Sequence, residues 1–258
     1  MDRDLQEIKS NMLKMAHYSH ASHIGAALSV VDILYYIYKN CAEINVENVK
    51  SIERDKVILS KGHASIALYT VLAQLGLLDK EKLNQYYIDG GVLPGHLDKD
   101  SEAGVDCSAG SLGHGLPIAI GMALAHPQHN IFVVMGDGET QEGSVWESFI
   151  YAGKHSLSNL TIVIDNNNLQ AFGRADEVAD YTKLVDTLNN FGLEACEIDG
   201  HNFDEIEKAF ARKTAKTKVI IAHTIKGHGV SFMENELKWH YKSPNDEELA
   251  LALQEVNQ

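Results

Sequence analysis

Apolar residues recur along the chain at helical spacing in several stretches. In residues 3 to about 20 most apolar positions lie three or four residues apart with polar residues between them, namely Leu5, Ile8, Met12, Met15 and Ala16. This pattern predicts an amphipathic first helix. Further helices are expected at about 29–39, up to residue 75, up to about 155 and around 203–215.

Short apolar runs between these helices predict β-strands. They are KVILS, IFVVM, LTIVI, EACEI and VIIAHTI, at residues 56–60, 131–135, 160–164, 194–198 and 219–225. Continuously apolar strands are typical of parallel sheets covered on both faces. Because strands and helices alternate, we expect an α/β fold: a three-layer, open, mainly parallel sheet with helices on both faces. Residues 1–258 are expected to form one domain, with the loop-like segment 77–110 as an active-site excursion.

Composition narrows the functional classes. The chain is 45% hydrophobic and 22% charged, as in ordinary globular proteins, and its net charge of −14 disfavours nucleic acid and anionic membranes as partners. Its three cysteines form no CxxC pair, so neither a disulfide framework nor a zinc site is expected. The charged N-terminus and the lack of a long apolar run predict a soluble, cytoplasmic protein.

Two polar loops follow neighbouring predicted strands, where open parallel sheets bind ligands. In the first, Asp137 lies between two glycines, which let an anion approach the backbone; in the second, Asn167 lies in a run of three asparagines. The Asp137 carboxylate, the Asn167 amide and a carbonyl such as that of Leu169 offer oxygens to a hard cation. Either loop alone is typical of a turn or strand cap. Together they predict a Mg²⁺–diphosphate site.

The text GDGETQEG followed by IDNNNLQAFG resembles the thiamine-diphosphate signature of transketolases. Other segments resemble family motifs in the family's order: SHIG at 22–25 (SGHPG), KGHAS at 61–65 (NGHGS), PGH at 94–96, GSLGHG at 110–115 (GPLGQG), and KGHGVS at 226–231 (KGxG) followed by Trp239-His240 (WHG). The resemblance covers nearly the whole chain. It implies the diphosphate-domain fold of thiamine-diphosphate enzymes.

The resemblance also implies cofactors and residue roles. The cofactors are thiamine diphosphate and Mg²⁺, with Ca²⁺ or Mn²⁺ as possible substitutes, and the metal ligands are Asp137, Asn167 and the Leu169 carbonyl. The implied cofactor contacts are His63, Leu112, Gly113, His114, Gly138, Glu139, Asn167 and Lys226. The implied catalytic residues are His23 and His240 in proton movement, His63 toward the donor sugar and His96 at the donor's terminal hydroxyl.

Two of these family matches have simpler interpretations. Glu142 matches a glutamate at the contact between two cofactor domains, but an acid at a helix N-terminus is also favoured by the helix dipole. Lys226 is interpreted either as a contact in the cofactor region or as a solvated loop lysine.

In the family, a pyrimidine-binding domain and a C-terminal domain follow the region matched here, so we expect them on a partner chain. The chain is thus interpreted as the N-terminal subunit of a split transketolase, active only with its partner, as a two-plus-two heterotetramer. The expected reaction moves a two-carbon ketol unit from a ketose, or its phosphate, to an aldose. The alternatives are a subunit like deoxyxylulose-phosphate synthase and a non-catalytic, cofactor-binding regulatory subunit. Neither GxGxxG nor GxxxxGK[ST] occurs, which argues against a nucleotide-binding dehydrogenase.

Overall fold

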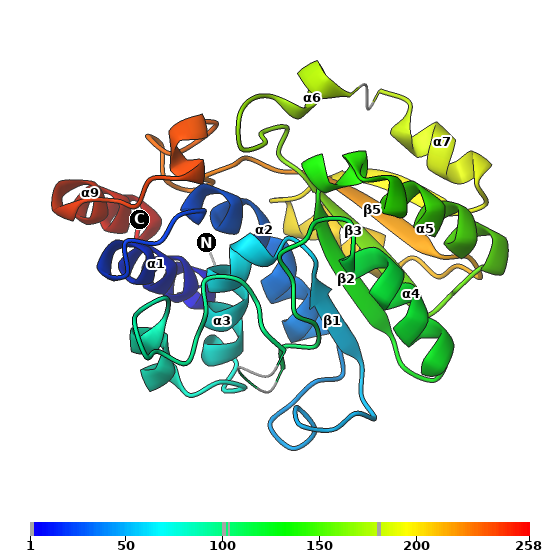
Figure 1. Ribbon diagram of the computed structural model, residues 1–258, viewed down its shortest axis with the longest axis horizontal. Helices are drawn as coiled ribbons and strands as arrows, with labels where there is room; N and C mark the ends of the chain where they lie inside the picture. The colour runs from blue at the N-terminus through cyan, green and yellow to red at the C-terminus, as the bar shows by residue number, and fades with distance from the viewer. Residues whose placement is uncertain (1–2, 100–101, 103, 180–181) are drawn as a thin grey trace.

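The computed structural model describes residues 3–99, 102, 104–179 and 182–258 (Figure 1). In this described part, one sheet has five strands, in the spatial order β1-β2-β3-β5-β4, and every neighbouring pair is parallel. The strands are β1 (Lys56–Leu59), β2 (Ile131–Gly136), β3 (Leu160–Asn166), β4 (Glu194–Asp199) and β5 (Lys218–His223). The predicted parallel α/β sheet is therefore confirmed.

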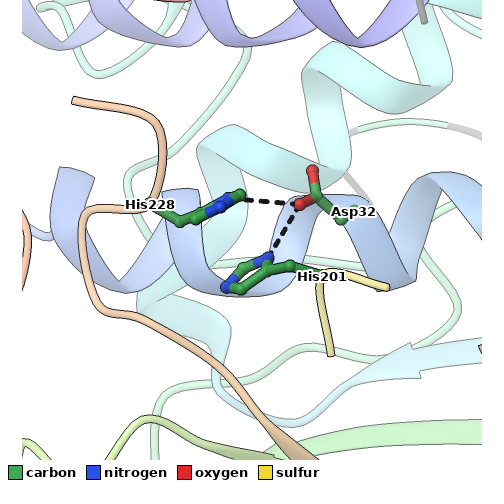
Figure 2. A group of neighbouring side chains, drawn as sticks. All are labelled: Asp32, His201 and His228. Carbon is green, nitrogen blue, oxygen red and sulfur yellow. Dashed lines mark hydrogen bonds and ion pairs between the residues drawn. The ribbon is translucent and has the colours of Figure 1, made fainter. Parts of the chain in front are cut away.

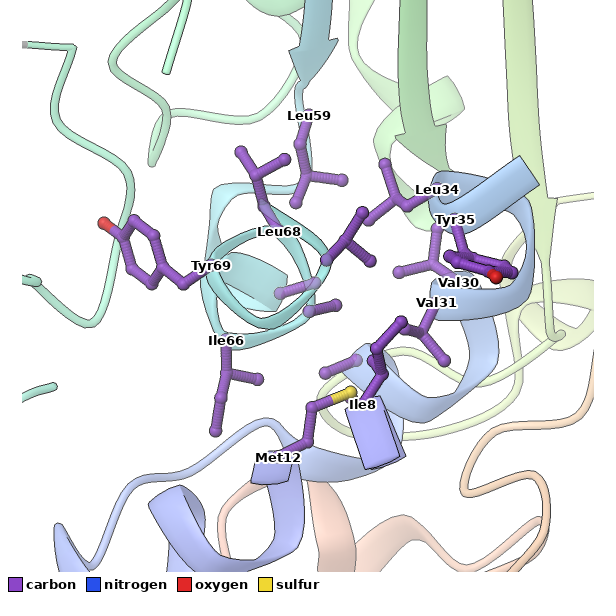
Figure 3. Close-up of a cluster of buried hydrophobic side chains, with 14 of the residues drawn as sticks. Ile8, Met12, Val30, Val31, Leu34, Tyr35, Leu59, Ile66, Leu68 and Tyr69 are labelled. Atoms are coloured by element: carbon purple, nitrogen blue, oxygen red, sulfur yellow. The ribbon is translucent and has the colours of Figure 1, made fainter. Parts of the chain in front are cut away.

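One face of the sheet carries the larger hydrophobic core. Side chains alternate along the strands, so Val57 and Leu59 of β1 face this core while Ile58 faces the other. The helices on this side are α1 (Arg3–Tyr18), α2 (Ile24–Tyr36), α3 (Ser65–Gln74), α8 (Phe203–Ala211) and α9 (Asp246–Val256). Figure 3 shows side chains of α1, α2 and α3 meeting in this core, and α9 packs on α1.

The opposite face is covered by α4 (Gly115–Ala125), α5 (Gly143–His155) and α7 (Leu184–Asn190), with the short α6 (Ala175–Val178) in the preceding connection (Figure 1). The spacing of apolar residues does not predict α4, because its residues, GLPIAIGMALA, are all apolar and show no period. The helices α6, α7 and α9 are also absent from the predictions. The first two are only one or two turns long, too short for a periodic pattern to emerge.

The segment 77–110 forms an excursion on the edge of the molecule. Its described part contains a 3₁₀ turn, Lys80–Gln85, and otherwise irregular chain; Asp100, Ser101 and Ala103 lie outside the described residues. Asp106 ties the end of the segment to β1: it accepts from the backbone N–H of Val57 at 2.9 Å and forms a buried ion pair of 2.8 Å with Arg54, just before the strand. Among the described helices, none is long and apolar enough to cross a bilayer.

Candidate active site

The loops that leave the carboxyl ends of β1, β2, β3 and β5 meet in one pocket of about 380 Å³. Strands β2 and β3 are neighbours in register, with Gly136 beside Asp165, so the two loops predicted to converge do converge. The N-terminus of α2 and the excursion supply the remaining wall through His23 and His96. This is the position at which open parallel sheets bind ligands.

Asp137, Asn167 and Leu169, predicted as metal ligands, all line the pocket. The Asp137 carboxylate accepts the backbone N–H groups of Gly138, at 2.7 Å, and Asn168, at 2.5 Å, which hold it at the strand end. The amide nitrogen of Asn167 donates to Asp165 at 3.3 Å, so the amide oxygen of Asn167 points away from Asp165. Burial, and then the nearby charge of Asp165, raise the pKa of Asp137 to about 6. A bound cation would stabilise the carboxylate.

Lys226 is only 1% exposed, so its interpretation as a solvated loop lysine is wrong. Its ammonium donates to the carbonyl oxygen of Leu169 at 3.1 Å and lies 3.0 Å from Nδ1 of His240. Burial, and then the charge of Lys61, lower the pKa of Lys226 to about 8. The Leu169 carbonyl has two lone pairs, and Lys226 occupies one of them. If a cation binds the Leu169 carbonyl oxygen, the Lys226 ammonium is placed to contact an anion that is bound to that cation.

A second buried lysine, Lys61, lines the pocket and was not predicted from the sequence. It forms an ion pair with Asp165, which is fully buried and also accepts hydrogen bonds from Ser29, at 2.7 Å, and from Thr224. Burial favours the neutral acid, but the Lys61 charge and these hydrogen bonds keep the pKa of Asp165 below its usual value. Both residues carry a signal in the sequence: each is a charge at the end of an apolar run, VILSK and TIVID.

The four histidines predicted as catalytic lie together. The ring of His23 has its centroid 4.8 Å from that of His240, 5.2 Å from His63 and 5.8 Å from His96. Their segments are far apart in the sequence, and the backbone N–H of His23 joins two of them by donating to the His240 carbonyl at 2.9 Å. His23 has a φ of 71°, a left-handed conformation that is costly for a residue with a side chain.

Three of these imidazoles are held neutral. Burial, and then the positive charges of neighbouring groups, lower the pKa of His23 to about 4 and that of His240 to about 3. The same causes hold the pKa of His63 well below its usual value. A neutral imidazole can accept a proton from a hydroxyl group.

Two buried polar atoms in the pocket wall, Nδ1 of His23 and Nε2 of Gln170, have no hydrogen-bond partner among the described residues. Buried polar groups are normally paired, so these atoms mark positions where a polar ligand fits. A side chain at Gly138 would lie 3.1 Å from Gln170, so glycine keeps the chain close to this wall. Oxygen donors for a cation, ammonium groups for an anion and two unpaired polar atoms suit a metal-bound diphosphate.

Glu139 and Gly113, predicted as cofactor contacts, are bonded to each other. The buried carboxylate of Glu139 accepts from the backbone of Gly113 at 2.8 Å and from the hydroxyl of Ser60, so it braces the turn that carries Leu112 into the pocket wall. Gly113 has a φ of 81°, and a side chain there would come within 2.6 Å of Glu142. Burial raises the pKa of Glu139.

His114 and Glu142 lie at the helix ends beside the pocket. His114 is the exposed N-cap of α4, with Nδ1 3.1 Å from the Leu112 carbonyl, and it is not among the described residues that line the pocket. Glu142 lines the pocket and is the exposed N-cap of α5, so it has the helix-terminal position that suits an acid.

A parallel sheet with oxygen donors and buried ammonium groups at its strand ends is a nucleotide- or diphosphate-binding type of domain. The family described as transketolase, thiamine diphosphate binding domain, matches residues 5–256. The chain therefore belongs to the transketolase family and consists of this thiamine-diphosphate-binding domain over nearly its whole length.

Relatives of two lengths match the chain. It is 37% identical to the 6-deoxy-6-sulfo-D-fructose transketolase subunit SqwG of Clostridium sp. (strain MSTE9), covering 91% of this chain and 88% of the relative. It is 32% identical to one of the subunits of apulose-4-phosphate transketolase from Phocaeicola vulgatus, covering 97% and 91%. The crystal structure of Campylobacter jejuni transketolase matches with a TM-score of 0.87 and 30% identity, over 98% of this chain but only 42% of that protein.

Proposed function

We propose that this chain is the diphosphate-binding subunit of a two-subunit transketolase. With its partner it transfers a two-carbon ketol unit from a ketose, or a ketose phosphate, to an aldose. The observation that carries the proposal is the meeting of Asp137, Asn167, the Leu169 carbonyl and Lys226 in one pocket. This pocket belongs to a chain whose relatives of similar length are named transketolase subunits.

In the proposed site, Asp137, Asn167 and the Leu169 carbonyl hold Mg²⁺, for which Ca²⁺ or Mn²⁺ can substitute. Lys226 and the backbone at Gly138 face the diphosphate. When bound, thiamine diphosphate supplies an electron sink for carbon–carbon bond cleavage. The protein's own part is to bind the diphosphate end and to exclude water from it.

The histidines act on the sugar. His23 and His240, kept neutral by burial and neighbouring positive charge, accept and return the proton of the sugar hydroxyl next to the bond that breaks. His63 is assigned to contact the cofactor and the donor sugar; it lines the pocket, and its ring is 6.0 Å from that of His240. His96 is the exposed member of the group and binds the donor's terminal hydroxyl at the pocket mouth.

The second subunit is proposed to carry the pyrimidine-binding domain, with residues 1–258 as a single diphosphate-binding domain. Support comes from the outward faces of α4 and α5, where Ile118 is 40%, Leu124 48%, Ile150 53% and Tyr151 42% exposed. These two helices lie side by side and pack on each other (Figure 1). Each begins next to residues that line the pocket, Leu112 and Glu142. An exposed apolar face of this kind is typical of an interface. We call these four residues the α4–α5 face and assign it to contact with the partner, in a two-plus-two assembly.

Relatives of similar length are named for different sugar substrates. Relatives of comparable identity carry names that specify a sulfofructose in one case and apulose 4-phosphate in another. The proposed reaction is ketol transfer between two sugars. The three free cysteines and the acidic net charge suit a reducing cytoplasm.

The test is a titration of thiamine diphosphate with Mg²⁺ into the chain alone and into its mixture with the product of the adjacent gene, followed by a ketol-transfer assay. Turnover is expected only in the mixture. Asp137→Ala is expected to weaken Mg²⁺-dependent binding by roughly 100-fold or more without unfolding, because it removes a metal ligand at a strand end. Turnover by the chain alone would contradict the need for a partner. Cofactor binding without turnover in the mixture would favour a non-catalytic regulatory subunit. Turnover with pyruvate and an aldehyde would favour a subunit like deoxyxylulose-phosphate synthase.

A further inference from the structure

Behind the pocket, Asp32 of α2 is surrounded by three polar side chains from distant segments: Lys9, His201 and His228. Figure 2 shows the two histidines of this group pointing toward Asp32. The Asp32 carboxylate lies 2.9 Å from Nζ of Lys9 on α1, 2.8 Å from Nδ1 of His201 after β4, and 3.4 Å from Nδ1 of His228 after β5. Lys9 and Asp32 are almost fully buried, at 1% and 2% exposure. We call these four residues the Asp32 cluster.

A carboxylate with two histidines is a combination that can bind a metal ion, but the hydrogen bonds argue against one here. The backbone N–H of Ile225 donates to Nε2 of His201 at 2.9 Å, so in the neutral ring the proton is on Nδ1 and points to Asp32. A protonated nitrogen cannot be a metal ligand. The Lys9 ammonium, 3.4 Å from Nδ1 of His228, would also repel a cation.

The cluster instead holds the segment that bears Lys226. His201 binds the backbone at Ile225, one residue before Lys226, and His228, two residues after it, is held by Asp32. Between these two anchors the Lys226 side chain runs into the pocket to reach Leu169 and His240. Its stem passes so close to α2 that a side chain at Gly25 would lie 3.2 Å from it.

The charge on Asp32 is what joins the two anchors. Burial favours the neutral acid, but hydrogen bonds from His201 and His228, together with the Lys9 charge, hold the pKa of Asp32 below its usual value. Asp32 is therefore a carboxylate that accepts from both rings. An asparagine of the same shape would lose this charge and would leave the Lys9 ammonium buried without its counterion.

We infer that Asp32 is a positioning residue for Lys226: by fixing His201 and His228, it places the ammonium against the Leu169 carbonyl and beside His240. The inference rests on the proposed function, because it assigns to Lys226 a contact with the diphosphate. Asp32 itself lines no part of the pocket in the described structure, so its effect on cofactor binding is indirect, and the Lys226 segment is the part of the pocket wall that His201 and His228 hold.

The test is a double-mutant cycle on the affinity for thiamine diphosphate at fixed Mg²⁺. It uses the chain alone if the unmodified chain binds the cofactor by itself, and otherwise the mixture with the partner. Asp32→Asn is expected to weaken binding about tenfold in the unmodified background but less than about twofold in a Lys226→Ala background, since the group it positions is then absent. An unchanged affinity for Asp32→Asn overturns the inference. So does an equal loss in both backgrounds, which would mean a general disturbance of the fold.

Two further variants keep the result interpretable. If Asp32→Asn does not fold, His228→Ala removes one anchor at a half-buried position, and the same dependence on Lys226 is expected. Thr217→Val is the stability control: it removes buried hydrogen bonds to Ala152 and Leu157 at the opposite end of the sheet and should leave affinity unchanged. If the unmodified chain does not bind the cofactor, the proposed function fails; if it binds and the cycle shows no coupling, only the positioning role fails.

Discussion

Helices α2 and α4 lie on opposite faces of the sheet, and both are built almost entirely from apolar residues. In α2 every residue from Ile24 to Tyr35 is buried, because α1 and α3 pack against the side turned away from the sheet. In α4 only the sheet-facing side is buried, and Ile118 and Leu124 remain 40% and 48% exposed.

The two helices differ in how their outer sides are covered. A helix that is apolar all round is normally buried all round. The outer side of α2 is covered by the chain itself, whereas the described residues leave the outer side of α4 open. The apolar outer side of α4 therefore supports the proposed contact with the partner, and the N-terminus of α4 lies beside the pocket.

The largest expected effect comes from a matched pair of isoleucines. Ile33→Ala in α2 empties a fully buried position and is expected to lower the free energy of unfolding by about 2–5 kcal/mol. Ile118→Ala in α4 is expected to change it by less than about 0.5 kcal/mol. Urea unfolding of the chain alone measures both. Similar losses for both variants would mean that the α4–α5 face is already covered in solution, for example by a second copy of the chain.

The next effect concerns assembly. Ile118→Glu combined with Ile150→Glu puts two charges on the α4–α5 face and is expected to weaken partner binding by about tenfold or more, because charged groups are costly to bury. Titration calorimetry with the partner measures the affinity. Ile52→Glu is the matched control, since Ile52 is 74% exposed but precedes β1 at the opposite end of the sheet. If Ile52→Glu lowers the affinity for the partner equally, the α4–α5 face is not the specific interface.

The sequence predicts the parallel sheet and the convergence of the two loops proposed to hold the metal, because both signals are local. Each loop directly follows an apolar run, and the parallel sheet then brings Asp137 and Asn167 to the same edge. The four histidines were identified by a resemblance of short motifs, and the structure brings their rings together.

What could not be predicted depends on contacts between distant segments. Asp165 meets Lys61 across 104 positions, and Asp32 meets His201 across 169. No periodic pattern connects such residues. The helix α4 was missed for a different reason: its exposed side is as apolar as its buried side, so no period marks the side that faces the sheet.

A smaller effect concerns how stability depends on pH, and it compares the N-cap residues of the same two helices, His23 of α2 and His114 of α4. Burial, with positive charge from His96, Lys226 and Lys61, sets the pKa of His23 at about 4, against 6.5 for the free side chain. Between these values the unfolded chain binds more protons than the folded chain, so stability falls as the pH falls from 6.5 toward 4.

His23→Asn keeps a residue that tolerates the left-handed backbone and is expected to reduce this acid-induced loss by about 1–2 kcal/mol, after allowance for solvent around the half-buried ring. Unfolding midpoints at about pH 7 and about pH 4.5 measure it. His114→Asn is the control at the exposed N-cap of α4 and should keep the pH dependence of the unmodified chain. An equal reduction in both variants would show that burial of His23 is not the cause.

The smallest expected effect changes sign between the free chain and the complex. A methyl group at Gly121 of α4 would meet no atom within 4 Å, so Gly121→Ala should stabilise the free chain by about 0.5–1 kcal/mol through its helix propensity. Gly153→Ala in α5 should instead destabilise it, because a side chain there would lie 2.0 Å from the Phe191 carbonyl oxygen. If the partner packs closely on α4, the same methyl group occupies space that the partner needs. Gly121→Ala should then lower the affinity for the partner while it stabilises the free chain. If the variant raises both the stability of the free chain and the affinity, the partner binds elsewhere.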